Sequence, residues 1–561
     1  MITLRTIPRR RAVVLLAVLV VVVLLSLAAY QYSELMTAEY HAAHSSATAL
    51  QARAAADSGV WFAAALLSNP DNLSTMTGNP WDNAPTFQDV AISADGTSNN
   101  NSGSNTDNGK QMLFSLVSVR NLDDPLASSQ PYRFGVVDES GKINLNSLLQ
   151  IDPSGNAGSQ MLMMLPNMTQ EIANSILDWM DTDDTPRQGG SENDYYSGQS
   201  PPYQCKNGPF DSLEELLLVS GVTPQLLFGN DRNRNGVLDP GEDDGTGQTN
   251  PGWLPYLTVY SRESNADSQG NPRIYLNDGN LNELNTNLTT AVGQNLAQFI
   301  IAYRLYGGSS SGGGSGSGSG GTGSSSSSSS SSGSSALSGA DSSAVATQIN
   351  SDMANSSNMK LTKISSLFSL VNASVSVKVG TGNSQRTITY NSPLKDPNQQ
   401  QQLLPLLLDE TTTSPNAELA PRININTASQ VVLSALPGLS DSDVQTILTN
   451  RPQISDGSTP DPSFQTVAWL VLQANFSISK MQTLENYITA RTQVYRIQSL
   501  GYASNGGPVA RVEAVIDTNL GRPRVLYWRD LSELGKGFDL SQANSNNSGS
   551  NNSGSTSNNN H

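Results

Sequence analysis

The N-terminal segment restricts the fold of this chain more than any other feature. Residues 12–29 form a run of apolar residues, and the arginines that precede it are Arg5, Arg9, Arg10 and Arg11. A helix rises about 1.5 Å per residue, so this run spans most of a hydrocarbon core about 30 Å thick, and the arginines favour the cytoplasmic side. Helix formers then continue, without proline, as far as Pro70. We expect one helix from about Ala12 to Leu67, mildly interrupted by Gly59.

A secretory signal peptide is the alternative interpretation of this segment. The apolar core is longer than a signal peptide usually has, and the small-x-small candidate Ser26-Leu27-Ala28 is followed by no turn residue. Helical sequence continues instead through Tyr30 and Ala56. The segment therefore favours a retained membrane anchor, with the rest of the chain delivered across the membrane.

Composition argues against several classes of function. The formal net charge of −17 disfavours nucleic acid as the main partner, because phosphate binding needs a basic surface. The single cysteine, Cys205, excludes an intrachain disulfide. The histidines are His41, His44 and His561, so the body of the chain offers no histidine as general base or zinc ligand. An anchored hydrolase that uses carboxylates alone remains compatible with this composition but gains no positive support.

Segments typical of β-strands flank a long middle segment. They are rich in β-branched and aromatic residues and are separated by turn residues. The predicted strands are residues 112–120, 132–137, 494–502, 509–516 and 524–528. Strands on both flanks predict an α+β fold in which the middle segment is inserted into one small antiparallel sheet. Within the middle, residues 374–379 and 386–390 predict a decorating hairpin.

The middle segment contains a divergent repeat. Its phrases are Lys142-Ile-Asn-Leu-Asn146, Arg273-Ile-Tyr-Leu-Asn277 and Arg422-Ile-Asn-Ile-Asn426. After the first and third phrases, further pieces match: residues 165–168 parallel 436–439, and 210–216 parallel 464–470. Each of these two units predicts a helix, a tight turn, a second helix, a loop and a short capped helix.

These units look like helix-hairpin-helix motifs, which hold DNA phosphates through backbone amides of the turn. The residues around 436–443 are acidic, and no lysine lies near the turn. Phosphate would be repelled there. A structural role in packing a mainly helical domain is therefore the favoured interpretation.

Residues 231–242 match the calcium-loop pattern D-x-[DN]-x-[DN]-G-x5-E at every specified position, with Gly236 at the turn. Calcium prefers six to eight oxygen ligands, and this spacing wraps them around one point. The predicted ligands are Asp231, Asn233, Asn235, Asp239 and Glu242. The alternative is an acidic turn that matches by accident. No second helix is evident after the loop, so it predicts an EF-like loop and not a complete EF-hand.

The short basic leader, the apolar segment and the helical spine that leads into a head together resemble the type IV pilin and pseudopilin family. The resemblance implies that a prepilin peptidase cuts between Ala12 and Val13 and that the new N-terminus is methylated. Most subunits of that family carry Glu at mature position 5, which is Ala17 here. An amine buried in hydrocarbon needs a carboxylate from a neighbour, so a subunit without this Glu offers none to a subunit above it. The absence resembles the K-class minor pseudopilins of type II secretion, which cap the tip.

A second acidic cluster, residues 178–196, is similar to the K-class signature D-W-x-D-x-D…G-x-E-x-D-Y-Y. By spacing alone the cluster supports only a solvated acidic turn or, less well, a paired-carboxylate hydrolase centre. The resemblance implies an inserted helical domain that binds Ca²⁺ through carboxylates. The implied ligands are Asp181, Asp183, Glu192 and Asp194. The resemblance covers most of the chain but not residues 228–421, whose purpose the sequence does not explain.

The resulting interpretation is a non-enzymatic tip pseudopilin, single-pass in the inner membrane, with its bulk in the periplasm. The implied partners are the I- and J-class minor pseudopilins, the major pseudopilin, the prepilin peptidase and the inner-membrane platform, with no nucleic acid. The expected divisions are a leader (1–12), a membrane and spine helix (13–68), a β-sheet domain (69–140 and 491–535), an inserted domain (141–306 and 341–490), a Ser/Gly linker (307–340) and a polar tail (541–561). The rival hypothesis is a membrane-tethered helix-hairpin-helix DNA-binding protein of a competence system.

Overall fold

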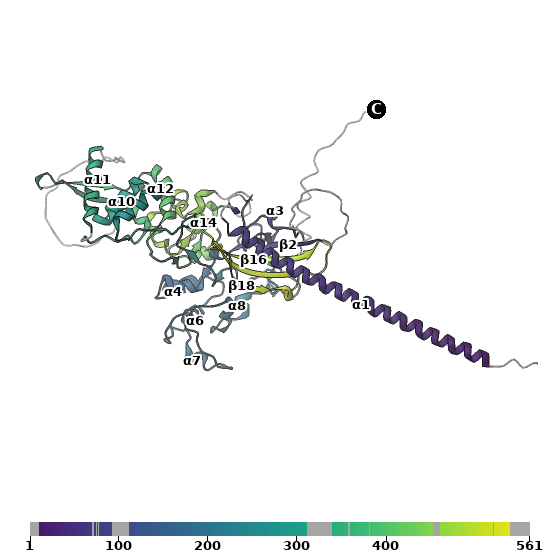
Figure 1. The fold of residues 1–561 in the computed structure, drawn as a ribbon. Coiled ribbons are helices and arrows are strands. Elements are labelled where there is room, and N and C mark those ends of the chain that lie inside the picture. Colours follow the sequence, from purple (N-terminus) through teal and green to yellow (C-terminus); the bar gives the residue numbers. More distant parts are fainter. Residues whose placement is uncertain are drawn as a thin grey trace, which may run out of the picture.

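A long helix, a twisted antiparallel sheet and a large mainly helical region make up the computed structural model (Figure 1). The structure describes residues 10–538 except 70–71, 74–75, 77, 93–110, 311–338, 357–358, 381, 453–460 and 520. Most of the expected leader, most of the Ser/Gly linker and all of the polar tail therefore lie outside the described residues.

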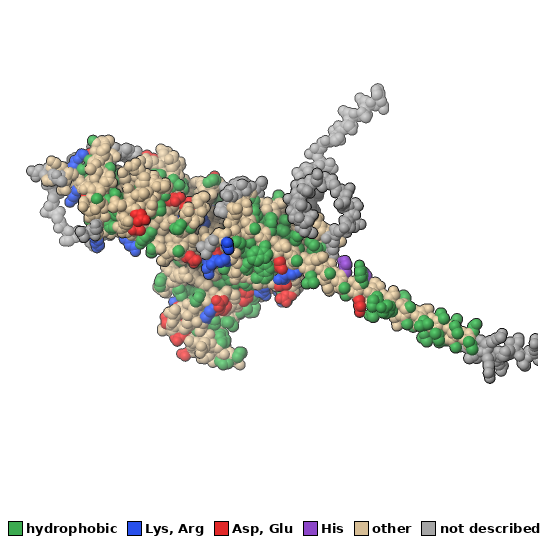
Figure 2. Space-filling model, viewed as in Figure 1, with side chains coloured by type: hydrophobic (Ala, Val, Ile, Leu, Met, Phe, Trp, Pro, Cys, Tyr) green, Lys and Arg blue, Asp and Glu red, His purple; other side chains and the backbone are tan. Residues whose placement is uncertain are grey.

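Helix α1 (Arg10–Leu67) is continuous, as the sequence predicts. Its N-terminal half projects from the head and exposes apolar side chains from Val14 to Leu27 (Figures 1 and 2). Its C-terminal half packs on strands β2, β16 and β17 and buries small residues, including Ala52, Ala56 and Ala63. Of the described helices, α1 is the one long and apolar enough to cross a membrane. Gly59 does not interrupt it: a Cβ there would lie 2.2 Å from Oγ of Ser499, so glycine lets the helix approach the sheet.

The sheet combines strands from both flanks of the middle segment. Its order is β1-β2-β16-β17-β18, with β3 on β2 and β4 on β16, and all these pairs are antiparallel. The predicted antiparallel sheet is therefore confirmed. The strands are β1 (Val90–Ala91), β2 (Met112–Val119), β3 (Tyr132–Phe134), β4 (Val137–Asp138), β16 (Val494–Ala503), β17 (Ala510–Asp517) and β18 (Arg524–Asp530). The short helix α3 (Ala84–Phe87) covers one end of it near β2 and β3.

Replacing Gly501 of β16 by alanine should separate the spine helix from the sheet. The added Cβ would lie 2.0 Å from the carbonyl oxygen of Ala52 and 2.4 Å from the nitrogen of Ala56, both backbone atoms that cannot move alone. Overpacking of this kind costs about 1–3 kcal/mol or more, so we expect a lower unfolding midpoint and faster proteolysis after α1. The matched control is Gly279→Ala, where no atom lies within 4 Å of the added Cβ; equal midpoints for the two variants would contradict this packing.

All three repeat phrases open a structural unit. Each phrase forms a short strand that pairs in parallel with a strand near the end of its unit: β5 with β6, β8 with β12, and β14 with β15. We call residues 143–258 unit 1, 274–412 unit 2 and 423–489 unit 3. The last asparagine of each phrase donates through Nδ2 to a distant carbonyl. These bonds are Asn146 to Phe210 (2.9 Å), Asn277 to Ile364 (2.8 Å) and Asn426 to Phe464 (2.9 Å).

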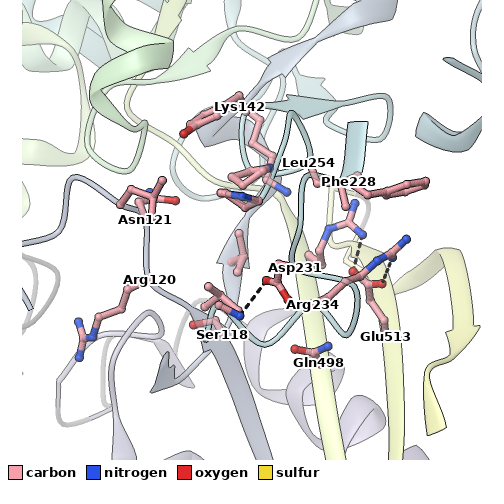
Figure 3. Close-up of a pocket in the computed structure, with 18 of the residues that line it drawn as sticks. Ser118, Arg120, Asn121, Lys142, Phe228, Asp231, Arg234, Leu254, Gln498 and Glu513 are labelled. Atoms are coloured by element: carbon pink, nitrogen blue, oxygen red, sulfur yellow. Dashed lines mark hydrogen bonds and ion pairs between the residues drawn. The ribbon is translucent and has the colours of Figure 1, made fainter. Parts of the chain in front are cut away.

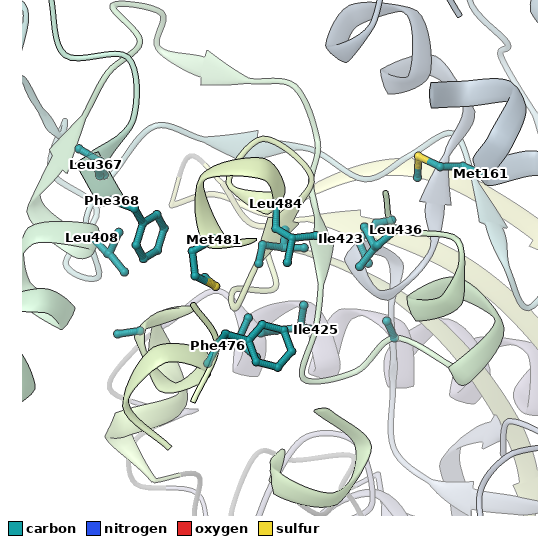
Figure 4. Close-up of a cluster of buried hydrophobic side chains, with 14 of the residues drawn as sticks. Met161, Leu367, Phe368, Leu408, Ile423, Ile425, Leu436, Phe476, Met481 and Leu484 are labelled. Carbon is teal, nitrogen blue, oxygen red and sulfur yellow. The ribbon is translucent and has the colours of Figure 1, made fainter. Parts of the chain in front are cut away.

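Most of the segment that the sequence did not explain, residues 228–421, is therefore unit 2, built on the same plan as its neighbours. Figure 4 shows Phe368 and Leu408 of unit 2 facing Met481 of unit 3, so one apolar core joins these units. The strands of the units are β5 (Ile143–Asn144), β6 (Leu257–Thr258), β8 (Ile274–Tyr275), β12 (Thr411–Thr412), β14 (Ile423–Asn424) and β15 (Ile488–Thr489).

Helices fill each unit between its paired strands. Unit 1 holds α4 (Leu148–Ile151), α5 (Asn156–Leu162), α6 (Gln170–Met180), α7 (Asn193–Tyr196) and α8 (Pro224–Phe228). Unit 2 holds α9 (Leu281–Val292), α10 (Gln294–Tyr306), α11 (Gly339–Ala354) and α12 (Pro397–Glu410), and the predicted hairpin is present as β10 (Ala373–Val379) and β11 (Arg386–Asn391), with β9 (Ser309–Ser310) beside β10. Unit 3 holds α13 (Gln430–Ser434), α14 (Asp441–Asn450), α15 (Ala468–Leu472) and α16 (Ile478–Leu484). Strands β7 (Glu263–Ser264) and β13 (Glu418–Leu419) pair between the units.

Asp138, at the end of β4, joins the sheet to unit 3. Its Oδ2 accepts hydrogen bonds from Asn424 (2.9 Å), Thr427 (2.6 Å) and Thr492 (2.6 Å), and its Oδ1 accepts from the N–H of Ser140. No cation pairs with it among the described residues. Burial, only partly opposed by these hydrogen bonds, raises the pKa of Asp138 to about 6.

The contribution of Asp138 to protein stability should therefore fall as pH rises from about 4 to about 6. The folded state holds the Asp138 proton up to about pH 6, whereas the unfolded state releases it near pH 4, so stability from this residue is complete below pH 4 and declines toward pH 6. The loss is on the order of 2–3 kcal/mol. Asp138→Asn should flatten this part of a curve of unfolding midpoint against pH. An unchanged slope in the variant would contradict the assignment to Asp138.

Candidate functional site

Three carboxylates converge at the end of helix α6. One oxygen from each of Asp178, Asp181 and Glu192 lies within 4.8 Å of the others. Asp178 is in the last turn of α6 and Asp181 follows three residues later, so both fall on one side of the helix. The loop after α6 returns and places Glu192, the residue before α7, against the same point.

Local sequence explains why α6 can hold this position. Thr169 caps its N-terminus by accepting a hydrogen bond from the N–H of Ile172, and apolar residues at helical spacing bury one face. Beside the carboxylates, Trp179 is buried and its indole N–H donates to Glu215 at 2.9 Å. The carboxylates therefore stand on a rigid, anchored helix end.

The three carboxylates of the cluster are paired with a single arginine. Arg187 donates to Asp178 at 2.8 Å through Nη1 and also pairs with Asp181. Glu192 is only 3% exposed, and both of its carboxylate oxygens are buried without a hydrogen-bond partner among the described residues. Burial and the nearby charges of Asp181 and Asp178 raise the pKa of Glu192 to about 7. One arginine for three carboxylates leaves room for a divalent cation, whose oxygen preference this donor set matches.

The structure brings together only some of the acids that the sequence predicted as ligands. Asp181 and Glu192 belong to the three-carboxylate group, whereas Asp183 and Asp194 are exposed and lie outside it. Asp183 instead accepts the N–H of Thr185 at 2.9 Å, as in a solvated turn. The group also includes Asp178, which sequence reasoning left out. Its spacing was the signal available, because Asp178 precedes Asp181 by three residues and residues three apart share a helix face.

The EF-like loop folds around Asp231. Its carboxylate accepts the N–H groups of Asn235 (3.0 Å) and Gly236 (2.9 Å), and Gly236 has a φ of 71°, in the region that favours glycine. Glu242 reaches back and accepts the N–H groups of Arg232 (2.9 Å) and Asp239 (3.1 Å). Asp239 in turn accepts from the side-chain amides of Asn233 and Asn235.

The loop is anchored to the sheet and not to a second helix. The buried Arg511 of β17 donates to the carbonyls of Asn233 (2.6 Å) and Arg234 (2.7 Å). Figure 3 shows Arg234 beside Glu513 and Asp231 at the edge of a cavity of about 190 Å³ between the loop and the sheet. The described loop acids accept backbone N–H groups or side-chain amides and do not converge as a three-acid group, so the α6 cluster fits a divalent cation better than the loop does.

The turn of unit 3 is already hydrogen-bonded. Ser440 caps α14 by accepting the N–H of Asp443, and the carboxylate of Asp443 accepts the N–H of Ser440 at 2.8 Å. Asp443 also pairs with Lys480 at 2.6 Å. A phosphate approaching this turn would meet a carboxylate and N–H groups that are already engaged.

Comparison with known proteins matches two stretches of the chain. Models of the family described as "Type II secretion system (T2SS), protein K" match residues 141–228 and 423–491, which include most of units 1 and 3. In these two stretches the chain is similar to the type II secretion system protein K family. Unit 2 lies between the two matched stretches.

Curated relatives match shorter stretches of the chain. The chain is 38% identical over 58 residues to a putative type II secretion system protein K of Escherichia coli (strain K12), and 30% identical over 95 residues to the type II secretion system protein K of Pseudomonas aeruginosa. It is 28% identical over 116 residues to the protein of the same name in Klebsiella pneumoniae. These matches cover 10%, 16% and 21% of this chain and 18%, 28% and 30% of the relatives, so the chain spans less than a third of each relative.

A solved structure is also similar. It is the GspK-GspI-GspJ complex from the type 2 secretion system of enterotoxigenic Escherichia coli. The match has 12% sequence identity and a TM-score of 0.34, and it covers 88% of this chain and 99% of that one.

Proposed function

We propose that this protein is a minor pseudopilin that occupies the tip of the type II secretion pseudopilus and starts and caps its assembly. The observation that carries the proposal is helix α1. Its projecting half is apolar and exposed, and it carries no acidic residue before Glu34. At Ala17, where a subunit above would need a carboxylate for its buried amine, this helix offers a methyl group.

The size of the head supports the same role. Three stacked units and the sheet all lie at the C-terminal end of α1 (Figure 1). Helices of further subunits can pack against the sides and the lower end of α1, but the head covers its upper end. Growth then proceeds only from below, from the inner membrane, while the head stays in the periplasm.

The proposed partners follow from this arrangement. The I- and J-class minor pseudopilins and the major pseudopilin would pack their own apolar helices against α1. The prepilin peptidase would process the leader, and the inner-membrane platform would supply the subunits. The helical hairpins of units 1 and 3 would serve packing and not DNA binding.

We also propose that calcium stabilises the head without taking part in chemistry. Asp178, Asp181 and Glu192 would hold one ion, and the orphaned oxygens of Glu192 support this assignment. The EF-like loop is a second, weaker candidate, with Asp231, Asp239 and Glu242 as its charged ligands.

A label on the head tests the tip position. The protein carries an affinity tag in a surface loop of unit 2, away from α1, and assembled pseudopili are labelled with gold against this tag. Electron microscopy should then show gold at only one end of each fibre. A tagged major pseudopilin should be labelled along the whole fibre. Gold along the fibre from the unit 2 tag would contradict capping.

Mass spectrometry of the mature protein should find an N-terminus at Val13 that carries one methyl group. Cleavage between Ala12 and Val13 removes the basic leader and leaves the apolar helix in the membrane. Ala12→Gly should be processed at the same bond and at least as completely. A mature protein that starts beyond Ala29 and is free of the membrane would contradict both the processing site and the pseudopilin role.

A further inference from the structure

The three units share a basic residue before their first strand, but its charge is not balanced in the same way. Lys142, before β5, pairs with Glu139 at 2.7 Å, and Arg422, before β14, pairs with Glu263 at 2.8 Å through Nε. Arg273, before β8, forms no ion pair with the described residues. Its side chain makes one hydrogen bond to them, from Nε to the carbonyl of Asp409 at 2.9 Å.

Both terminal nitrogens of Arg273 are therefore available to a ligand. Burial and the neighbouring charge of Arg422 lower the pKa of Arg273 to about 10, so it still carries its charge at neutral pH. A half-buried guanidinium without a directly bonded carboxylate is costly, and two parallel N–H groups match the two oxygens of a carboxylate or phosphate.

Arg273 lines a cavity of about 340 Å³ where units 1, 2 and 3 meet. Unit 1 contributes Gln150 from α4, unit 2 contributes Phe368, Leu408 and β12, and unit 3 contributes residues 465–467, which precede α15, and β15. Thr413 and Ser414, directly after unit 2, complete this wall. Several polar side chains in this wall donate no hydrogen bond to the described residues. They are Gln150, Thr413, Gln465, Thr466 and Asn486.

The acids around Arg273 are Glu263, Asp267 and Glu410, and their charges act on it without a direct ion pair. Glu485, the one carboxylate among the described lining residues, accepts the N–H of Leu367 at 3.0 Å and the hydroxyl of Ser366. Glu263 is held by Arg422, and Asp409 pairs with Arg491, whose Nη1 donates to the carbonyl of Ala266. The wall therefore presents positive charge and free donors although the whole chain is acidic, and salt screens the more distant acids over about 8 Å.

We propose that this cavity binds a compact organic oxyanion that carries hydroxyl groups, such as a sugar acid or a sugar phosphate. Arg273 binds the charged group through two parallel hydrogen bonds. The threonine hydroxyls and the amides of Gln150 and Gln465 bind the ligand hydroxyls, and Phe368 and Ile488 supply an apolar wall for its carbon skeleton. The inference is independent of the proposed place at the pseudopilus tip, because it concerns only the junction of the three units.

Calorimetry on the full-length protein in detergent tests the proposal, with glucuronate, glucose 6-phosphate, inorganic phosphate and neutral glucose as probes. We expect glucuronate or glucose 6-phosphate to bind, glucose not to bind, and inorganic phosphate to bind more weakly than the sugar anions because it lacks the hydroxyl contacts. The stronger of the two sugar anions identifies the charged group as carboxylate or phosphate. If neither sugar anion binds at millimolar concentration, the cavity holds only water and the proposal is overturned.

Variants then assign the contacts. Arg273→Gln should weaken binding of the sugar anion at least tenfold. Arg273 also supports the carbonyl of Asp409, so Thr413→Val provides a second variant. It breaks no side-chain hydrogen bond among the described residues and should weaken binding severalfold. Arg386→Gln removes an exposed arginine outside the cavity and should leave binding unchanged. Wild-type affinity in both Arg273→Gln and Thr413→Val would overturn the site.

Discussion

Replacing Arg496 by methionine should destabilise the head more than any other single substitution discussed for this protein. Arg496, on β16, lies between two buried carboxylates, Glu139 and Glu513, at 2.7 Å from each. Although burial alone would raise the pKa of Glu139, the charges of Arg496 and Lys142 hold it at about 2. Methionine leaves both carboxylates short of positive charge, and breaking a buried pair in this way costs about 3–5 kcal/mol.

The pH dependence identifies the cause of this loss. In the wild type, the lowered pKa of Glu139 contributes stability that is present above pH 4.5 and is lost as pH falls toward 2. The variant lacks much of this contribution, so its deficit in a urea titration should be larger at pH 7 than at pH 4. The control is Arg386→Met, which removes an exposed ion pair with Asp341 and should change stability by about 1 kcal/mol or less. Equal losses in the two variants would contradict the network.

Calcium should raise the melting temperature of the wild-type head, and chelation should reverse the rise. An ion that binds only the folded state stabilises it by about 2.7 kcal/mol when its concentration is 100 times the dissociation constant. Glu192→Gln should remove most of this calcium response because it deletes the carboxylate whose oxygens have no other partner. In the presence of chelator the same variant should be at least as stable as the wild type, because a buried, unpaired charge has been removed.

Two control variants separate the candidate sites. Asp194→Asn changes an exposed acid outside the three-carboxylate group and should keep the calcium response. Glu242→Gln removes the chelating acid of the EF-like loop and should reduce only the part of the response that the loop supplies. A full response in Glu192→Gln would remove the cluster at α6 as the site, and no response in the wild type would remove calcium altogether.

Local patterns predicted the extended elements well. The helix ending at Leu67, strand β2 and the β16–β17 hairpin lie within a few residues of the predicted ranges, because apolar periodicity and turn residues act over short distances. The repeat phrases were also visible, but unit 2 was not. Its strands β8 and β12 pair across 137 positions, from Ile274 to Thr411, and no further matching pieces follow its phrase in the sequence.

The candidate site, too, was predicted only in part from the sequence. Sequence alone established that acids gather around residues 178–196 and that the loop at 231–242 has the spacing of a calcium loop. Only the tertiary structure decided which acids meet, since the return of the loop after α6 brings Glu192 to Asp178 and leaves Asp183 and Asp194 in solvent. Side-chain spacing specifies a face of a helix or strand, whereas convergence of distant residues depends on how loops close and on which groups packing removes from water.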